Sequence, residues 1–186
     1  MASLNILGIC GSLRANSANR HALAAAAELM PATMQLTVAD YSELPLYNQD
    51  VQDQGMPAAA TRLAEQIRAA DALLIASPEY NFSVSGVLKN AIDWMSRVPP
   101  QPFRDKPVAL LSATAGPLGG ARHQYELRKI LGGLDALVLT KPEVFIGLCQ
   151  TKFDANGMLV DPATRKVVTD QMLALEVWIN RVLVRQ

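Results

Sequence analysis

Six polar side chains of the types that bind phosphate lie in one short stretch, ICGSLRANSANR, at positions 9–20. They are two serines, two arginines and two asparagines, namely Ser12, Arg14, Asn16, Ser17, Asn19 and Arg20. An apolar run precedes them and an alanine-rich segment follows, so they mark the junction of a strand with a helix N-terminus, whose N–H groups and dipole favour an anion. No acidic residue precedes Glu28, which makes this part of a neutral chain locally cationic. The stretch predicts a phosphate site; the alternative is that Ser17 only caps the helix and both arginines are solvated.

The spacing within this stretch excludes three common phosphate loops. A Walker A loop needs a Gly-Lys pair, which the chain lacks, and Gly8 with Gly11 does not complete a dinucleotide-binding GxGxxG. Only three residues separate Cys10 from Arg14, fewer than in the loop of cysteine-dependent phosphatases. Cys10 is therefore expected to be a buried residue at the end of a strand.

Two more loops carry turn residues and polar groups after apolar runs: PEYNFSVSG follows LLIAS, and ATAGPLGG follows VALLS. Because parallel strands end at the same edge of a sheet, the three loops are expected to converge on one pocket. Residues 78–81 offer N–H groups, a carboxylate, an aromatic face and an amide, and the glycines of the other loop let the backbone approach a flat ligand. A phosphate at one end and a flat ring with amide-like edges at the other describe flavin mononucleotide (FMN). The alternative for residues 78–81 is a type I turn that starts a helix.

The elements that would position these loops alternate along the chain. Five short apolar runs predict buried strands, at residues 4–9, 34–39, 72–77, 108–114 and 143–147. Five segments with helical periodicity lie between or after them, at residues 18–30, 57–70, 86–98, 120–134 and 161–183. This alternation predicts one α/β domain over residues 1–186, built on a doubly wound parallel sheet with helices on both faces. The long loop 41–56 is predicted to be functional.

Composition narrows the class of protein further. Lys plus Arg and Asp plus Glu both total 17, so the chain has neither an overall basic charge for nucleic acid nor the acidic excess of a carrier that docks by charge. The two cysteines stand far apart without ligand-like spacing, and no apolar run approaches the roughly 18 residues of a membrane span. We therefore expect a soluble cytoplasmic protein with no nucleic-acid, membrane or metal partner. His21 and His123 are the only histidines, so acid–base hydrolysis has few candidate bases, whereas redox chemistry carried by a cofactor needs none.

Four segments taken together resemble a known family: GSLRANSANR, LPLYNQD, SPEYNFSVSGVLKNAIDW and GGARHQYELRKIL. They are similar to NAD(P)H-dependent FMN reductases, specifically the flavodoxin-like quinone and chromate reductases of bacteria, over nearly the whole chain. The resemblance implies a five-stranded parallel sheet in the order 2-1-3-4-5 and tightly bound, non-covalent FMN, with NADPH or NADH as co-substrate. It also implies the FMN-binding residues, which are Ser12, Arg14, Ser17, Ala18 and Asn19 around the phosphate, Pro78, Glu79, Tyr80 and Asn81 at the isoalloxazine, and Ser112, Gly116 and Gly119 at its pyrimidine edge.

The reaction implied by this resemblance is ping-pong: NAD(P)H reduces the flavin and leaves, and an oxidant then takes the electrons. The oxidants implied are quinones, with chromate, other metal oxyanions or azo compounds as a wider range, and no protein side chain is expected to act as the catalytic group. One alternative is a flavodoxin-like electron-transfer protein without a small-molecule substrate, against which the neutral net charge counts. Another is a scaffold protein that uses the fold without a cofactor.

The resemblance also implies assembly into a homodimer or homotetramer. Arg122, Tyr125 and Glu143 match positions of an intersubunit polar network in relatives, and Phe82 stands where some members have a tyrosine. The loop 41–56 and a partner subunit are expected to supply the remaining wall of the pocket. The alternative for the three network residues is a solvated surface.

Overall fold

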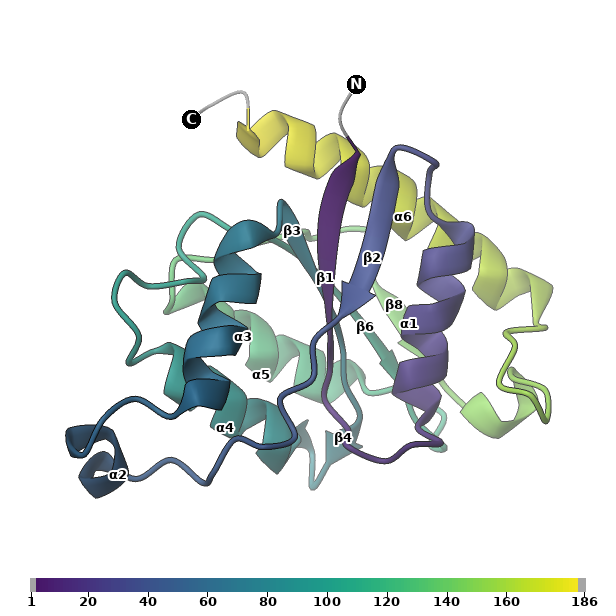
Figure 1. Cartoon of the computed structure of the whole chain (residues 1–186). Coiled ribbons are helices and arrows are strands. Elements are labelled where there is room, and N and C mark those ends of the chain that lie inside the picture. Colours follow the sequence, from purple (N-terminus) through teal and green to yellow (C-terminus); the bar gives the residue numbers. More distant parts are fainter. Residues whose placement is uncertain (1–2, 184–186) are drawn as a thin grey trace.

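The computed structural model, which describes residues 3–183, is built around a parallel sheet (Figure 1). Its strands lie in the order β2-β1-β3-β6-β7, and β8 also pairs with β6. Their bounds are β1 Leu4–Cys10, β2 Met34–Val38, β3 Ala72–Ala76, β6 Pro107–Ala113, β7 Leu137–Val138 and β8 Val144–Ile146. The order 2-1-3-4-5 implied by the resemblance is therefore confirmed.

The fifth strand of this order is divided into two pieces. β7 pairs with Pro107 and Val108 at the start of β6, whereas β8 pairs with the last three residues of β6. Between the two pieces lies Pro142, which has no N–H group to donate to a strand ladder. The sequence predicted only the second piece, because two apolar residues such as those of β7 are too short to be recognised as a strand.

Helices cover both faces of the sheet, so the strands β3 and β6 are buried along their whole length. Alternate residues point to opposite faces: Leu73 and Ile75 belong to one core cluster, and Leu74 and Ala76 to the other. On the first face pack α3 (Ala58–Ala69), α4 (Gly86–Met95) and α5 (Ala121–Gly132), and on the second α1 (Ala18–Leu29) and α6 (Pro162–Leu183), as Figure 1 shows. All the helices predicted from the sequence thus form.

Besides β7, three short elements were not predicted: α2 (Gln49–Asp53), a 3₁₀ turn (Cys149–Thr151), and a hairpin of β4 (Glu79–Tyr80) and β5 (Ser83–Val84). At the hairpin turn Asn81 and Phe82 have positive φ angles of 49° and 66°, as in the tight turns that suit the twist of paired strands. The turn contains no glycine, the residue that usually reveals such a turn in a sequence. The alternative of a type I turn that starts a helix is wrong, because the hairpin intervenes before α4.

The long loop 41–56 is fixed to the rest of the domain by several hydrogen bonds, of which two show its path. Tyr41 is buried, and its hydroxyl donates to the carbonyl of Cys10 at the end of β1. The indole Nε1 of Trp94, on α4, donates to the carbonyl of Pro45 at 2.8 Å. The loop therefore connects the end of the first strand with the helix that follows the hairpin.

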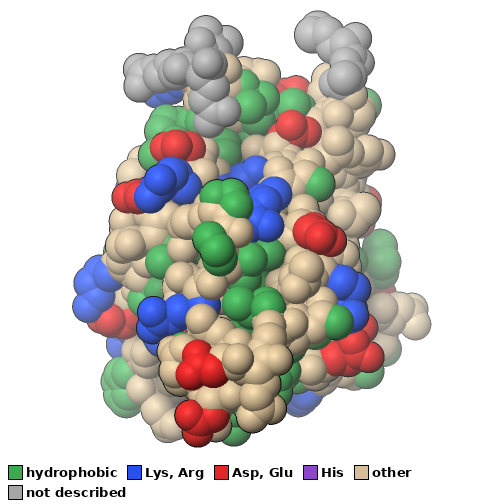
Figure 2. Space-filling view, turned by 60° about the vertical axis from the view of Figure 1, so that its left-hand side comes forward, with side chains coloured by type: hydrophobic (Ala, Val, Ile, Leu, Met, Phe, Trp, Pro, Cys, Tyr) green, Lys and Arg blue, Asp and Glu red, His purple; other side chains and the backbone are tan. Residues whose placement is uncertain are grey.

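The surface carries mixed charge. Figure 2 shows Lys and Arg side chains beside Asp and Glu on one face, with hydrophobic side chains among them. Such a face offers no large field of a single sign to steer a charged macromolecule. Within residues 3–183 no helix has the length and hydrophobicity needed to cross a membrane, and no group of three or more His, Cys, Asp or Glu side chains could hold a metal ion.

Candidate functional site

A pocket of about 390 Å³ opens at the carboxyl ends of β1, β3 and β6. It is lined by Ser12, Arg14, Ser17, Ala18, Asn19, Pro78, Glu79, Tyr80, Ala113, Thr114, Ala115, Gly116 and Cys149. A second pocket of about 380 Å³ continues from it, since Glu79, Thr114 and Gly116 line both. The loops that follow three parallel strands thus meet at one edge of the sheet, where ligands bind in open α/β folds.

The first loop forms one end of the pocket. Ser12 and Ser17 are buried there, and Ser17 caps α1 by accepting the N–H of Asn19 at 3.3 Å. Arg14 is exposed and lines the pocket, whereas Arg20 is exposed and lies outside the lining. Ser17 therefore does cap the helix, as the alternative to a phosphate site required. However, its hydroxyl lines the same pocket as the hydroxyl of Ser12, the guanidinium of Arg14 and the N-terminus of α1. That is the donor set of an anion site.

The amide of Asn19 serves the framework of the pocket. Its Nδ2 donates to the carbonyl of Ala113 at 2.9 Å, and its Oδ1 accepts the N–H of Ala113 at 2.9 Å. The side chain is almost fully buried. Asn19 thus ties the start of α1 to the end of β6 and joins two walls of the pocket, instead of offering its amide to a phosphate.

The backbone of the first loop passes over the end of β3 at a distance that only glycine allows. A Cβ on Gly11 would lie 2.2 Å from Ser77 Oγ and 2.6 Å from Ser77 Cβ. Ser85 Oγ donates to the carbonyl of Gly11 at 2.7 Å, and the hydroxyl of Tyr41 donates to the carbonyl of the preceding residue, Cys10. Cys10 is buried at the strand end, as predicted, and burial raises the pKa of its thiol. The loop is thus held in shape by contacts from several other segments.

The second loop contributes its first three residues, Pro78, Glu79 and Tyr80, to the pocket. Asn81, which the resemblance implied as a fourth contact, lies in the hairpin turn with an exposed side chain and does not line the pocket. The first strand of the hairpin therefore lines the pocket, and its turn lies outside the lining.

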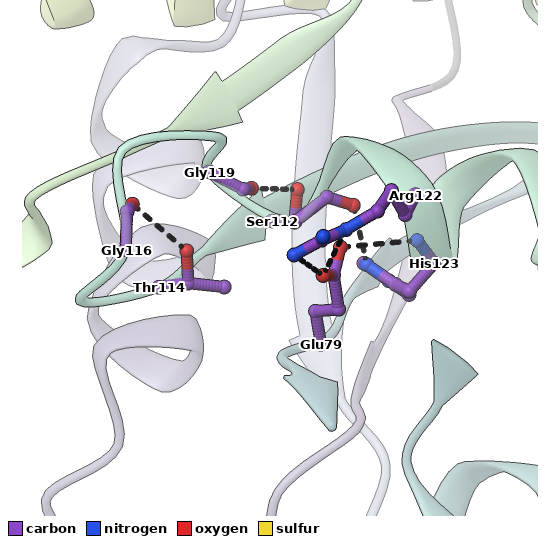
Figure 3. A network of polar contacts seen from close by, with 8 residues as sticks. Glu79, Ser112, Thr114, Gly116, Gly119, Arg122 and His123 are labelled. Atoms are coloured by element: carbon purple, nitrogen blue, oxygen red, sulfur yellow. Dashed lines mark hydrogen bonds and ion pairs between the residues drawn. The ribbon is translucent and has the colours of Figure 1, made fainter. Parts of the chain in front are cut away.

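Glu79 is the charged group of this loop, and its side chain is only 8% exposed. Its carboxylate accepts from Arg122 Nε at 2.7 Å and from the backbone N–H of His123 at 3.3 Å (Figure 3). Burial alone would raise the pKa of Glu79, but these hydrogen bonds and the charge of Arg122 outweigh burial and lower the pKa. Glu79 is therefore ionised at neutral pH.

The third loop contributes Thr114, Ala115 and Gly116. Ser112 and Gly119, which the resemblance implied at the pyrimidine edge, lie behind the pocket wall instead. Ser112 is fully buried; its Oγ donates to the carbonyl of Gly119 (Figure 3) and accepts from Gln124 Nε2 at 2.8 Å. A Cβ on Gly119 would lie 2.6 Å from the carbonyl carbon of Phe145. Both residues therefore shape the loop from behind.

Cys149 is a lining residue that the sequence reasoning missed, whereas Ala113, Thr114 and Ala115 belong to the predicted third loop but were not named as individual contacts. It follows β8, whose carboxyl end opens on the same edge as those of the other strands, and this shared edge was the signal that could have found it. Burial raises the pKa of its thiol. The loop 41–56, by contrast, contributes no residue to the lining of the pocket within one chain.

The three residues of the implied intersubunit network do not meet within one chain. Arg122 is paired with Glu79, and Glu143 is paired with Lys141. Tyr125 has an exposed side chain on α5. Their joint role in assembly stays a prediction.

The residues present fit FMN. At one end, hydroxyls, a guanidinium and a helix N-terminus suit a phosphate. At the other end, residues 78–80 and 114–116 present backbone and mostly small side chains, which suit the close approach of a flat ring. The two joined pockets give such an elongated ligand room at the strand ends.

Known proteins with similar sequences agree with this geometry. Residues 4–151 match the family of NADPH-dependent FMN reductases. The chain belongs to this family. It is 53% identical over 178 residues to an NAD(P)H-dependent FMN reductase of Pseudomonas aeruginosa, covering 96% of either chain. It is 44% identical over 182 residues to a quinone reductase of Escherichia coli, covering 96% of this chain and 97% of that protein.

A solved structure shows the same arrangement. The flavoenzyme NAD(P)H:(acceptor) oxidoreductase of Paracoccus denitrificans superimposes with a TM-score of 0.87 at 30% identity, covering 96% of this chain and 98% of that one. The resemblance drawn from the four sequence segments and the flavodoxin-like fold are therefore confirmed. This member of the FMN reductase family is an oxidoreductase, with FMN as its flavin and NAD(P)H as its co-substrate.

Proposed function

We propose that the chain is a single FMN-binding domain over residues 1–186 that transfers electrons from NAD(P)H to quinones by a ping-pong mechanism. The observation that carries this proposal is the meeting of three strand-end loops around one pocket, with an anion-binding donor set at one end and a backbone-lined crevice at the other. The related quinone reductase of Escherichia coli supports quinones as acceptors. Cys10 and Cys149 are both free, which supports a reducing compartment such as the cytoplasm.

Each part of the pocket has one task in this proposal. Ser12, Arg14 and Ser17 bind the FMN phosphate together with the N-terminus of α1. Residues 78–80 and 114–116 hold the ring tightly but without a covalent bond. When bound there, FMN would accept hydride from NAD(P)H and pass the electrons to the acceptor.

The titratable groups around the pocket support a reaction whose chemistry the cofactor carries. The carboxylate of Glu79 is occupied by Arg122, and burial raises the pKa of the Cys149 thiol. His123 is fully buried, and burial lowers its pKa, so the imidazole is neutral at pH 7. None of these groups is an available acid or base for the reaction, and no side chain is proposed as catalytic.

Steady-state kinetics test the reaction. The FMN-loaded protein is expected to oxidise NADPH or NADH steadily with benzoquinone, and initial rates at several fixed quinone concentrations are expected to give parallel lines in double-reciprocal plots. Intersecting lines contradict the ping-pong order. The absence of turnover with benzoquinone, in a protein shown to hold FMN, contradicts quinones as acceptors.

The proposal includes chromate, other metal oxyanions and azo compounds as further acceptors. The same assay tests them, with NADPH in excess and each acceptor in place of benzoquinone. A rate that does not exceed that of a flavin-free control removes that acceptor from the range.

We also propose that the chain forms a homodimer that pairs into a homotetramer through Arg122, Tyr125 and Glu143. Apolar side chains of the strand-end loops support this assembly, since they would be left in water on a monomer; they are Leu13, Tyr80, Phe82 and Leu118. Sedimentation is expected to show an oligomer at micromolar concentration, and a monomer contradicts the proposal. Glu143→Ala is expected to leave a dimer; a tetramer that persists contradicts the network alone.

A further inference from the structure

The carboxylate of Glu79 completes a helix that begins on a different loop. The cap position of α5 is Gly120, which has no side chain, and the first turn contains no acidic residue. His123 is the third residue of α5, and its N–H is one of those that a capping side chain normally binds. Glu79 Oε2 accepts this N–H at 3.3 Å, so the acceptor comes from the loop after β3.

The same carboxylate also forms an ion pair with Arg122, the second residue of the helix. Arg122 Nε donates to Glu79 Oε1 at 2.7 Å, and the guanidinium carbon of Arg122 lies 3.9 Å from the centre of the Phe82 ring. Phe82 belongs to the hairpin turn and Glu79 to its first strand. The hairpin therefore contacts the start of α5 through the carboxylate of Glu79, which Figure 3 shows, and through the aromatic ring of Phe82.

This contact joins the two walls between which the ring end of the crevice lies. Glu79 belongs to one wall, and Thr114 and Gly116, in the loop that leads to α5, belong to the other. Both carboxylate oxygens of Glu79 are engaged with α5. The carboxylate is therefore held by the start of the helix at the place where residue 79 lines the crevice.

We propose that Glu79 is a positioning residue, whose carboxylate caps α5 and pairs with Arg122 and so sets the separation of the two loops that hold the flavin ring. The proposal rests on the proposed function, because it takes the ligand of the crevice to be a flavin. It differs from the role implied for Glu79 by the resemblance, which was direct contact with the isoalloxazine.

The chain offers a matched control in Asp161. Its Oδ2 accepts the N–H of Thr164, the third residue of α6, at 2.8 Å, and its Oδ1 pairs with Lys152 Nζ at 2.9 Å. Asp161 thus also caps a helix and pairs with a cation, but it does not line the pocket. Glu79→Gln and Asp161→Asn remove equivalent interactions at two places, of which only one borders the crevice.

The test is a titration of the flavin-free proteins with FMN and with riboflavin, read from flavin fluorescence and from the visible spectrum of the bound flavin. Glu79→Gln is expected to raise the dissociation constants of both flavins by the same factor, about tenfold, because the ring is common to them. It is also expected to change the shape of the bound flavin's visible band. Asp161→Asn is expected to lower the melting temperature but to leave both constants and the spectrum unchanged.

The other outcomes overturn the proposal in distinguishable ways. Unchanged binding in Glu79→Gln overturns the positioning role and leaves the proposed function standing, whereas a wild-type protein that binds neither flavin overturns both. Equal weakening in Glu79→Gln and Asp161→Asn shows a general loss of stability, and weakening of FMN alone shows an effect on the phosphate; both overturn it. If Glu79→Gln does not fold, Glu79→Asp keeps the charge and is expected to weaken both flavins by a smaller equal factor, and unequal or unchanged constants overturn the proposal.

Discussion

The Arg14→Ala variant is expected to bind FMN about 10- to 150-fold more weakly than the wild type and to bind riboflavin with nearly the same affinity. Arg14 lines the phosphate end of the pocket, where its exposed guanidinium donates to the carbonyl of Asn16. A charge-assisted hydrogen bond to a phosphate contributes about 1.5–3 kcal/mol. Riboflavin has the same ring without the phosphate, so the two ligands separate the loss of this contact from general damage to the pocket.

Arg20→Ala is the control for this prediction. Arg20 carries the same charge in the first turn of α1, but it is exposed and lies outside the pocket lining. Fluorescence titrations of the wild type and both variants with both ligands are expected to show a loss only for Arg14→Ala with FMN. Equal weakening of FMN and riboflavin means that Arg14 supports the shape of the loop, and an unchanged affinity for FMN means that it is a solvated arginine. Either result contradicts its role as a phosphate ligand.

Gly11→Ala is expected to lower the free energy of unfolding by about 1–3 kcal/mol and to weaken the binding of both flavins. The new Cβ would lie 2.2 Å from Ser77 Oγ and 3.0 Å from Ser77 Cα, and Ser77 is fully buried. The first loop can relieve this contact only by moving off the end of β3, which also strains the bond from Ser85 to the carbonyl of Gly11. Urea unfolding of the flavin-free protein and flavin titrations measure the two effects.

A second substitution tests whether the clash with Ser77 is the cause. Ser77→Gly removes both side-chain atoms that the new Cβ meets, so Gly11→Ala is expected to cost much less in that background than in the wild type. Ser77→Ala removes only Oγ and leaves the Cβ that lies 2.6 Å away, so it is expected to recover little. If Gly11→Ala is equally harmful in all three backgrounds, the close approach to Ser77 does not explain the glycine.

Much of the architecture follows from local patterns in the sequence. The runs at 72–77 and 108–114 are apolar without alternation, and helical segments follow each of them, so a parallel sheet covered on both faces is the arrangement that buries them all. Because parallel strands share an edge, the position of three polar loops directly after strands was enough to predict a pocket there. Neither step requires knowledge of a long-range contact.

Whether an individual residue lines the pocket was harder to predict, because this depends on where each strand ends. Ser12 and Ser112 are both serines near the end of an apolar run. β1 ends at Cys10, so Ser12 lies in the loop, whereas β6 continues to Ala113 and keeps Ser112 inside the sheet. A shift of two or three residues in a strand end thus separates a residue that lines the pocket from one that lies behind its wall.

Contacts between distant segments were beyond the sequence. The side-chain amide of Asn19 hydrogen-bonds to the backbone of Ala113, 94 positions away, so no local sequence pattern predicts that Asn19 joins the two pocket walls. The first turn of α5 lacks a capping side chain, which indicates that the acceptor comes from elsewhere in the chain. The sequence does not identify Glu79 as that acceptor, because the pairing depends on the hairpin bringing residue 79 to α5.

The visible spectrum of the protein during anaerobic addition of NADPH or NADH tests the central claim most directly. The protein is predicted to be yellow when purified or after incubation with FMN, to bleach when either nucleotide is added, and to regain its colour with one equivalent of benzoquinone. A protein that stays colourless after incubation with FMN would contradict the account, as would a bound flavin whose absorption neither nucleotide changes.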